Sequence, residues 1–224
     1  MKNLEKQSKR IKKPWPTKDA MTQVYKMKLW GDNQSDFYSG EGSHHPTLVK
    51  PYLNVVIPFL TSFKDPITVC DLGCGDFNVG KKLVPYVKKY IAVDIVADLI
   101  TRNKKKFRDE KIEFCCLDIA KETLPPADGI ILRQVLQHLS NDEVNSIVSK
   151  LSKYTFAIVT EHIPDGDFEP NKDIISGQGI RLKKQSGLNL LTPPFNLKVK
   201  EERQLIAVVP TNHIGVLVTT LYIF

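Results

Sequence analysis

Two glycines and two carboxylates stand in a pattern that suits nucleotide binding. Gly73 and Gly75 directly follow a short apolar run that ends in Asp71, and Asp94 ends a second apolar run 19 residues after Gly75. Glycine lets the backbone turn tightly and approach a ligand closely. A carboxylate at the end of the next strand can accept hydrogen bonds from ribose hydroxyl groups. The spacing therefore predicts a nucleotide site at one edge of a parallel sheet.

The residues of the loop distinguish between classes of nucleotide. A dinucleotide fingerprint reads G-x-G-x-x-G, and Asn78 stands at its third glycine position, which disfavours an NAD(P) oxidoreductase. Residues 71–76, Asp-Leu-Gly-Cys-Gly-Asp, instead resemble the first motif of class I S-adenosylmethionine (SAM)-dependent methyltransferases. That family often has a further glycine where this chain has Phe77. The resemblance covers roughly residues 48–162 and 203–224.

The resemblance implies that SAM is the cofactor. In this family the glycine loop passes beneath the methionine part of SAM, and the acidic residue after the second strand binds the ribose. A carboxylate after the third strand, here Asp118, lies beside the adenine, and the segment that begins at Arg133 lines the methionine end or the substrate cavity. The residues expected to bind SAM are Asp71, Gly73, Cys74, Gly75, Asp94, Ile95, Asp118, Ile119 and Arg133.

The order of apolar and polar segments predicts an α/β fold. Repeated strand–helix units imply a parallel sheet covered on both faces. Strands are expected at 67–70, 90–93, 112–117, 129–132 and 156–160, and helices at 22–30, 48–63, 79–89, 97–108 and from 141 onward. Residues 203–209 and 216–224 are predicted to form an antiparallel hairpin, which is typical of these methyltransferases. The expected architecture is a three-layer sandwich around a mostly parallel seven-stranded sheet.

Composition and charge limit the class of protein. The chain has 224 residues, which suits one domain with a full core. Its net charge is +7, but residues 1–13 hold six basic residues and one acidic residue, so the remaining chain is only weakly basic. Four cysteines without metal-ligand spacing indicate reduced thiols and no metal site. With no apolar run near the ~18 residues of a membrane span, we expect a cytoplasmic protein that does not enter a membrane.

Three residues at the carboxyl ends of strands are candidates for catalysis. His138 follows the fourth strand, and Glu161 and His162 follow the fifth. A histidine or carboxylate at the mouth of the crevice can remove a proton from a hydroxyl or amine. Methyl transfer from a sulfonium depends mostly on alignment and on exclusion of water, so a strong base is needed only for a poorly ionised acceptor.

Two irregular segments are expected to enclose the site. Residues 1–20 are interpreted as a basic flexible tail, 21–47 as a lid segment, and 48–224 as the SAM-binding domain. Within the lid, Tyr38 and His44 are placed to reach the cofactor or the acceptor. Residues 163–200 lack helical periodicity and are interpreted as a substrate wall, in which Arg181 could hold a carboxylate or phosphate.

The sequence thus predicts a SAM-dependent methyltransferase that acts on an oxygen or nitrogen atom of a small polar or acidic acceptor. The alternatives are a methyltransferase of RNA or protein, which only the basic tail favours, and a non-catalytic SAM-binding module. Pro193-Pro194-Phe195 resembles part of an amino-methyltransferase motif, but it follows the fifth strand rather than the fourth. The acceptor and the oligomeric state are not indicated by the sequence.

Deletion of residues 1–13 should leave the fold and the affinity for SAM unaltered. This segment is charged and has little apolar surface to bury. Calorimetry with SAM and a thermal unfolding curve on the shortened chain would test this. Loss of turnover on a small acceptor would contradict the interpretation as a flexible arm.

Overall fold

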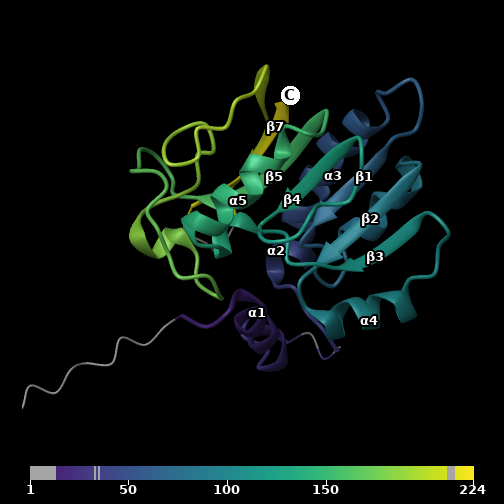
Figure 1. Cartoon of the computed structure of the whole chain (residues 1–224), viewed down its shortest axis with the longest axis horizontal. Coiled ribbons are helices and arrows are strands. Elements are labelled where there is room, and N and C mark those ends of the chain that lie inside the picture. Colours follow the sequence, from purple (N-terminus) through teal and green to yellow (C-terminus); the bar gives the residue numbers. More distant parts are fainter. Residues whose placement is uncertain (1–13, 33, 35, 211–214) are drawn as a thin grey trace, which may run out of the picture.

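The computed structural model describes residues 14–32, 34, 36–210 and 215–224 (Figure 1). Residues 1–13 of the predicted basic tail and residues 211–214 of the predicted hairpin turn lie outside the described residues. The tail is predicted to extend to residue 20, which is wrong for residues 17–20, because they belong to a helix. Within the described part no helix is long and apolar enough to cross a membrane.

A seven-stranded sheet forms the centre of the described structure, in the order β3-β2-β1-β4-β5-β7-β6. Strands β1 to β5 are parallel, whereas β7 runs antiparallel to both β5 and β6. This arrangement confirms the predicted fold class and its C-terminal hairpin. The strands are β1 (Thr68–Leu72), β2 (Lys89–Asp94), β3 (Ile112–Cys116), β4 (Gly129–Arg133), β5 (Phe156–Ile163), β6 (Glu201–Val208) and β7 (Val216–Ile223).

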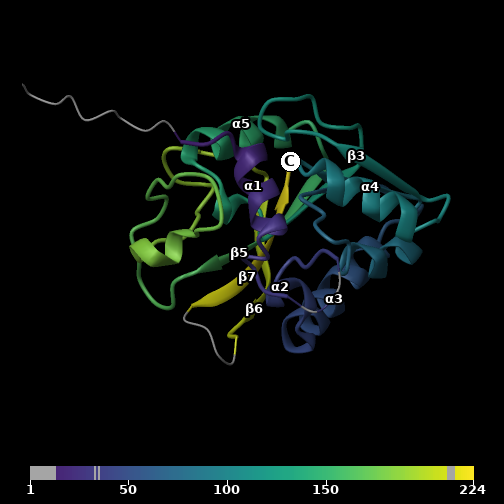
Figure 2. The ribbon, with the colours of Figure 1, turned by 90° about the horizontal axis from the view of Figure 1, so that it is seen from below.

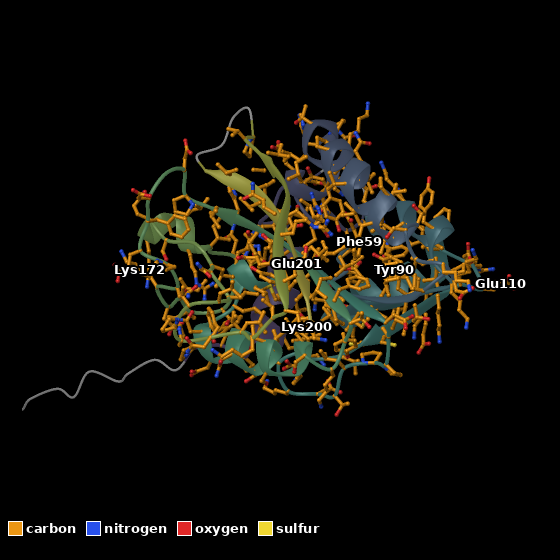
Figure 3. The ribbon with its side chains drawn as sticks, turned by 90° about the horizontal axis from the view of Figure 1, so that it is seen from above. Phe59, Tyr90, Glu110, Lys172, Lys200 and Glu201 are labelled. Atoms are coloured by element: carbon orange, nitrogen blue, oxygen red, sulfur yellow. The ribbon has the colours of Figure 1, made fainter. Side chains whose placement is uncertain are left out.

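Helices lie on both faces of the sheet because successive strand residues point in opposite directions. Cys70 and Leu72 of β1 pack into a cluster with α5, whereas Val69 packs into a second cluster with α3. Figure 3 shows side chains filling both layers, with Tyr90 inside the molecule and Glu110 and Lys172 at its opposite ends. The helices are α1 (Thr17–Lys26), α2 (Glu41–His44), α3 (Pro46–Leu60), α4 (Ala97–Lys106) and α5 (Asn141–Leu151).

Helix α1 lies across the edge of the sheet at which the parallel strands end (Figures 1 and 2). The helix begins at Thr17, earlier than the predicted start at residue 22. It stays attached to the domain through a hydrogen bond from the Thr17 hydroxyl to Glu143 on α5 (2.5 Å). The first described residues therefore cover the edge where the sequence predicts a ligand.

The helix predicted over residues 79–89 is wrong. Two 3-10 turns, Gly80–Lys82 and Val84–Tyr86, take its place. Pro85 has no backbone N–H, so a continuous α-helix would lose a hydrogen bond at its centre.

Phe77 explains the missing third glycine of the loop. Its backbone has φ +64°, a left-handed conformation that glycine adopts without cost. The side chain is fully buried and packs edge-on against Tyr90 and Phe114. Burial of a phenylalanine is worth about 1.5–3 kcal/mol, which offsets a backbone strain of about 1–3 kcal/mol.

The segment between β5 and β6 is ordered without regular helices, as its sequence predicts, apart from a 3-10 turn over Arg181–Lys184. The buried side chain of Asn171 organises it. Its amide nitrogen donates to the carbonyl groups of Asn189 and Pro193, and its oxygen accepts from the Asn189 N–H. A single buried amide thus replaces part of the hydrogen bonding that a helix would supply.

The Gly80→Ala variant should lose about 1–3 kcal/mol of unfolding free energy. A Cβ atom at Gly80 would lie 2.4 Å from the Phe77 ring, which aromatic neighbours hold in place. Urea denaturation would measure the loss. Gly179→Ala is the matched control, because a Cβ there meets nothing within 4 Å and the backbone is not left-handed. Equal stabilities of the two variants would contradict this packing.

Candidate functional site

A cavity of about 570 Å³ opens at the carboxyl ends of the parallel strands. Its floor is formed by the ends of β1, β2 and β4, and α1 together with residues 39–43 covers it. The cavity lies beside the boundary between β1 and β4, where the strand order reverses. Open α/β sheets bind their ligands at this position.

Backbone geometry requires both glycines of the loop. Gly73 has φ +83° and Gly75 has φ +55°. A Cβ atom at Gly73 would lie 2.4 Å from a Val135 methyl group, and one at Gly75 would lie 2.5 Å from the Ser39 hydroxyl. The loop therefore fits tightly between the β4 turn and the N-terminal segment, and it presents backbone rather than side chains to the cavity.

Asp94 combines a structural contact with an open position in the cavity. One carboxylate oxygen accepts the Gly75 N–H and the other accepts the Val96 N–H, both at 3.0 Å. Each oxygen has a further lone pair. Burial raises the pKa of Asp94 and the backbone N–H groups oppose that rise. Asp94 thus fixes the loop and can still accept hydrogen bonds from a ligand.

Asp71 lies beneath the loop and does not line the main cavity. It accepts a hydrogen bond from the Tyr90 hydroxyl at 2.9 Å and borders a separate small cavity of about 30 Å³. Burial raises its pKa to about 7, and the Tyr90 hydrogen bond opposes that shift. The structure therefore places Asp71 as a support of the loop, away from the main cavity.

Arg133 connects the two cavities. Its Nη2 donates to the Gly42 carbonyl at 2.6 Å, and its guanidinium lies 4.9 Å from the centre of the Tyr52 ring. Its Nε and Nη1 are buried and have no hydrogen-bond partner among the described residues. An arginine with two unused donors beside the loop is suited to a carboxylate.

The remaining predicted cofactor residues line the far end of the cavity. Asp118 accepts the Ala120 N–H at 3.1 Å and pairs with Lys121 at 2.8 Å. Ile95 and Ile119 supply apolar surface there, and Cys74 lies on the glycine loop. The structure thus brings eight of the nine predicted residues to one cavity, all except Asp71.

Glu161 and Arg181 do not line the cavity but clamp its wall from both sides. The two Glu161 oxygens accept the N–H groups of Leu136 (3.1 Å) and Gln137 (2.9 Å). Arg181 donates to the carbonyl groups of Leu136 (3.1 Å) and Leu139 (2.8 Å). Burial raises the pKa of Glu161 to about 8. The predicted role of Arg181 in holding a substrate is corrected, since this guanidinium is 1% exposed and is bonded to backbone.

The turn between these two side chains carries His138 into the cavity. The ring is buried and lies 5.1 Å from the Trp30 ring of the N-terminal segment. His162 lines the same part of the cavity, and its backbone N–H donates to the Gln137 side-chain oxygen at 2.8 Å. Two of the three predicted catalytic residues therefore meet in the cavity, and Glu161 lies behind them.

Tyr38 and His44 fasten the N-terminal segment rather than face the cavity. Their rings lie 4.6 Å apart, and His44 Nε2 lies 2.5 Å from an Asp76 carboxylate oxygen. The same oxygen accepts the Ser39 N–H, and the Ser39 hydroxyl accepts the Asp76 N–H. The described part of the predicted lid is thus closed onto the glycine loop.

Sequence reasoning missed several residues of the site. Tyr25 and Trp30 reach the cavity from α1 and the turn after it, and Gln137 reaches it from the β4 turn. Asp76 was also missed. Of these missed residues it alone had a signal in the sequence, because it directly follows Gly75 within the motif. Among the described residues no group of three or more His, Cys, Asp or Glu side chains could hold a metal ion. All four cysteines are free thiols.

Comparison with known proteins bears on the family and the fold. Residues 69–155 match the model of a family described as a methyltransferase domain. A comparison with proteins of curated function finds no match.

Solved structures show the fold. The chain is similar to the N-methyltransferase NodS from Bradyrhizobium japonicum WM9 in complex with S-adenosyl-L-homocysteine, at 14% identity and a TM-score of 0.60 over 90% of this chain and 98% of that chain. It is also similar to magnesium protoporphyrin IX methyltransferase (ChlM) from Synechocystis PCC 6803 with bound SAM, at 14% identity and a TM-score of 0.57 over 94% and 98% of the respective chains. A SAM-dependent methyltransferase of Leishmania major matches at 15% identity and a TM-score of 0.57 over 92% and 79%.

The Asp71→Asn variant should change how stability depends on pH. The pKa of Asp71 is raised in the folded protein, so the folded state binds a proton on Asp71 more tightly than the unfolded state does. The resulting contribution to the unfolding free energy is fully present below about pH 4 and is lost as the pH rises to about 7. The variant cannot lose a proton there, so its unfolding free energy relative to wild type should increase over this interval and stay constant above it. The expected gain is on the order of a few kcal/mol.

Urea denaturation at pH 5, 6, 7 and 8 would measure this difference. Asp98→Asn is the control, because Asp98 is exposed on α4. Parallel pH profiles of Asp71→Asn and wild type would show that Asp71 is ionised in the folded protein throughout.

Proposed function

We propose that the chain is a class I SAM-dependent methyltransferase that transfers the methyl group of SAM to an oxygen or nitrogen atom of a small polar or acidic molecule, a proposal supported by the methyltransferase-domain match over residues 69–155 and by the fold. The observation that carries the proposal is one partly covered cavity with two chemically different ends. The glycine loop and Asp94 border one end, and His138 and His162 border the other.

The first end suits the cofactor. Asp94 would accept the ribose hydroxyl groups, while Asp118, Ile119 and Ile95 would surround the adenine. The backbone at Gly73, Cys74 and Gly75 would lie beneath the methionine part. The unused donors of Arg133 would hold its carboxylate, since a guanidinium pairs with a carboxylate through two parallel hydrogen bonds.

The size and cover of the cavity support a small acceptor. Its volume of about 570 Å³ falls within the range of about 300–1,000 Å³ typical of small-molecule sites, and it must hold both cofactor and acceptor. Helix α1 and residues 39–43 lie over it. A polymer such as RNA or a folded protein would need an open groove, so this partial cover favours a small molecule over those acceptors.

The second end would align the acceptor. Methyl transfer is an in-line displacement at carbon, and its rate depends on alignment and on a dry site. His162 is the candidate for removing a proton from a hydroxyl or amine. Glu161 would act only by positioning the turn that carries His138. The N-terminal segment would exclude water while Tyr38 and His44 keep it closed.

The direct test is transfer of labelled methyl groups. The purified chain would be incubated with SAM labelled in its methyl group and with separate pools of small carboxylates, alcohols, phenols and amines. Label in a small product would support the proposal. Label transferred only to RNA or protein, or no transfer although SAM binds, would support one of the two alternatives.

The Asp94→Ala variant should bind S-adenosylhomocysteine at least about tenfold more weakly. Hydrogen bonds to a charged acceptor are worth about 1.5–3 kcal/mol, and the Gly75 N–H also loses its partner. Calorimetry would give both affinities. Asp98→Ala, on the exposed surface of α4, is the matched control. Equal affinities of Asp94→Ala and wild type would rule out Asp94 as the ribose ligand.

A further inference from the structure

We infer that Lys150 positions the loop that recognises the adenine of the cofactor, so that selectivity for adenine depends on a side chain outside the cavity. Lys150 lies in the last turn of α5 and does not line the cavity. The inference deepens the proposed function and rests on it, because it concerns the adenine end of the same site. Lys150 is then a positioning residue, which acts through Asp118 rather than by touching the cofactor.

The loop after β3 forms the adenine end of the cavity, which residues 117–120 line. The loop starts from a fixed point, because the Leu117 N–H donates to the Asp94 carbonyl group at 3.1 Å. It then folds back on itself. The Asp118 N–H donates to the Glu122 carboxylate at 2.8 Å, and the Asp118 carbonyl group accepts the Glu122 N–H at 2.8 Å.

Three carbonyl groups of this loop bind the Lys150 ammonium. Its Nζ donates to the carbonyl groups of Ile119 and Ala120 at 2.9 Å and to that of Glu122 at 2.8 Å. An ammonium has three N–H donors, so these bonds use every one of them. Each bond is charge-assisted and is therefore stronger than a hydrogen bond between neutral groups. One side chain thus fixes the orientation of three peptide groups in the loop.

The Lys150 ammonium binds the loop rather than its own helix. A basic side chain in the last turn of a helix is commonly stabilised by the carbonyl groups at that end. Lys150 instead reaches residues that precede it by 28–31 positions in the chain. Its neighbours Val148 and Leu151 on α5 are buried in the core. The loop is therefore tied to the core of the domain through α5.

Ala120 connects Lys150 to the carboxylate that would read the adenine. The Ala120 carbonyl group binds Lys150, and its N–H donates to the Asp118 carboxylate at 3.1 Å. Asp118 is paired with Lys121 at 2.8 Å, and an ionised carboxylate only accepts hydrogen bonds. It can bind the exocyclic amine of adenine, but it cannot bind a carbonyl oxygen at the same position. Movement of the Ala120 peptide group would displace this acceptor.

Two ligands that differ at the adenine amine test the role of Lys150. In S-inosylhomocysteine a carbonyl oxygen replaces the exocyclic amine of S-adenosylhomocysteine. Calorimetry on wild type should show at least about tenfold tighter binding of S-adenosylhomocysteine, as expected for a hydrogen bond to a charged group. Lys150→Met keeps an apolar stem without a donor, and it should lower this ratio below about threefold as that bond weakens. An unchanged ratio in the folded variant, or equal affinities in wild type, would overturn the inference.

The ratio separates positioning of the loop from a general loss of stability. A variant that is only destabilised binds both ligands more weakly and keeps the ratio. Lys153→Met is the matched control, because Lys153 follows α5 and is exposed, and it should keep both affinities. Lys150→Arg retains charge and donors, so its ratio should exceed that of Lys150→Met. The reverse order would contradict the role given to the ammonium.

Hydrogen exchange in the free protein measures the loop without any cofactor. Lys150→Met should speed exchange of the Ala120 and Glu122 N–H groups about tenfold, as expected for loss of charge-assisted hydrogen bonds from the loop. Exchange of the Cys70 N–H, in the buried strand β1, should not change. Equal exchange of the loop in Lys150→Met and wild type would show that Lys150 does not hold it.

Failure of the proposed function is distinguishable from failure of this inference. Calorimetry that finds no binding of S-adenosylhomocysteine to wild type would refute the proposed function, whereas exchange of the loop is measured in the free protein. Normal binding of S-adenosylhomocysteine with an unchanged ratio in Lys150→Met would refute only the role given to Lys150.

Discussion

The site depends on the turn between β4 and α5, which two side chains distant in the sequence hold from opposite sides. Glu161 accepts its N–H groups and Arg181 donates to its carbonyl groups, so the backbone of a tight buried turn is satisfied without water. Without either partner, buried backbone groups would be left unpaired at a cost of about 1–3 kcal/mol each. The positions of Gln137 and His138 follow from this clamp.

The clamp also explains the long irregular segment between β5 and β6. That segment brings Arg181 behind the cavity wall and Gln178 to Ile180 in front of it. This segment has little secondary structure, and the hydrogen bonds of the buried Asn171 amide hold its backbone in place instead.

The fold and the cofactor end could be predicted from local sequence. Strands, glycines and the carboxylate of Asp94 leave signals within a few residues of one another, and their geometry follows from short-range backbone rules. The same rules failed at residues 79–89, where Pro85 outweighed apolar periodicity. They selected Arg181 and Glu161 as site residues but could not anticipate their structural roles, because the sequence shows charged residues but not their burial against a backbone turn. The partners Ser39 and Asp76 are 37 residues apart and have no local signature.

The closed N-terminal segment has a thermodynamic consequence. Its hydrogen bonds are made to the glycine loop itself, through Asp76 and through the Asn78 side chain to the Ser43 carbonyl. A ligand of the loop that binds more tightly to this closed arrangement would be coupled to closure of the segment, and such coupling is reciprocal. A ligand that favours the closed loop tightens the segment by as much free energy as closure adds to ligand affinity. A substitution at Asn78, which does not line the main cavity, would then change affinity through this coupling rather than through a ligand contact.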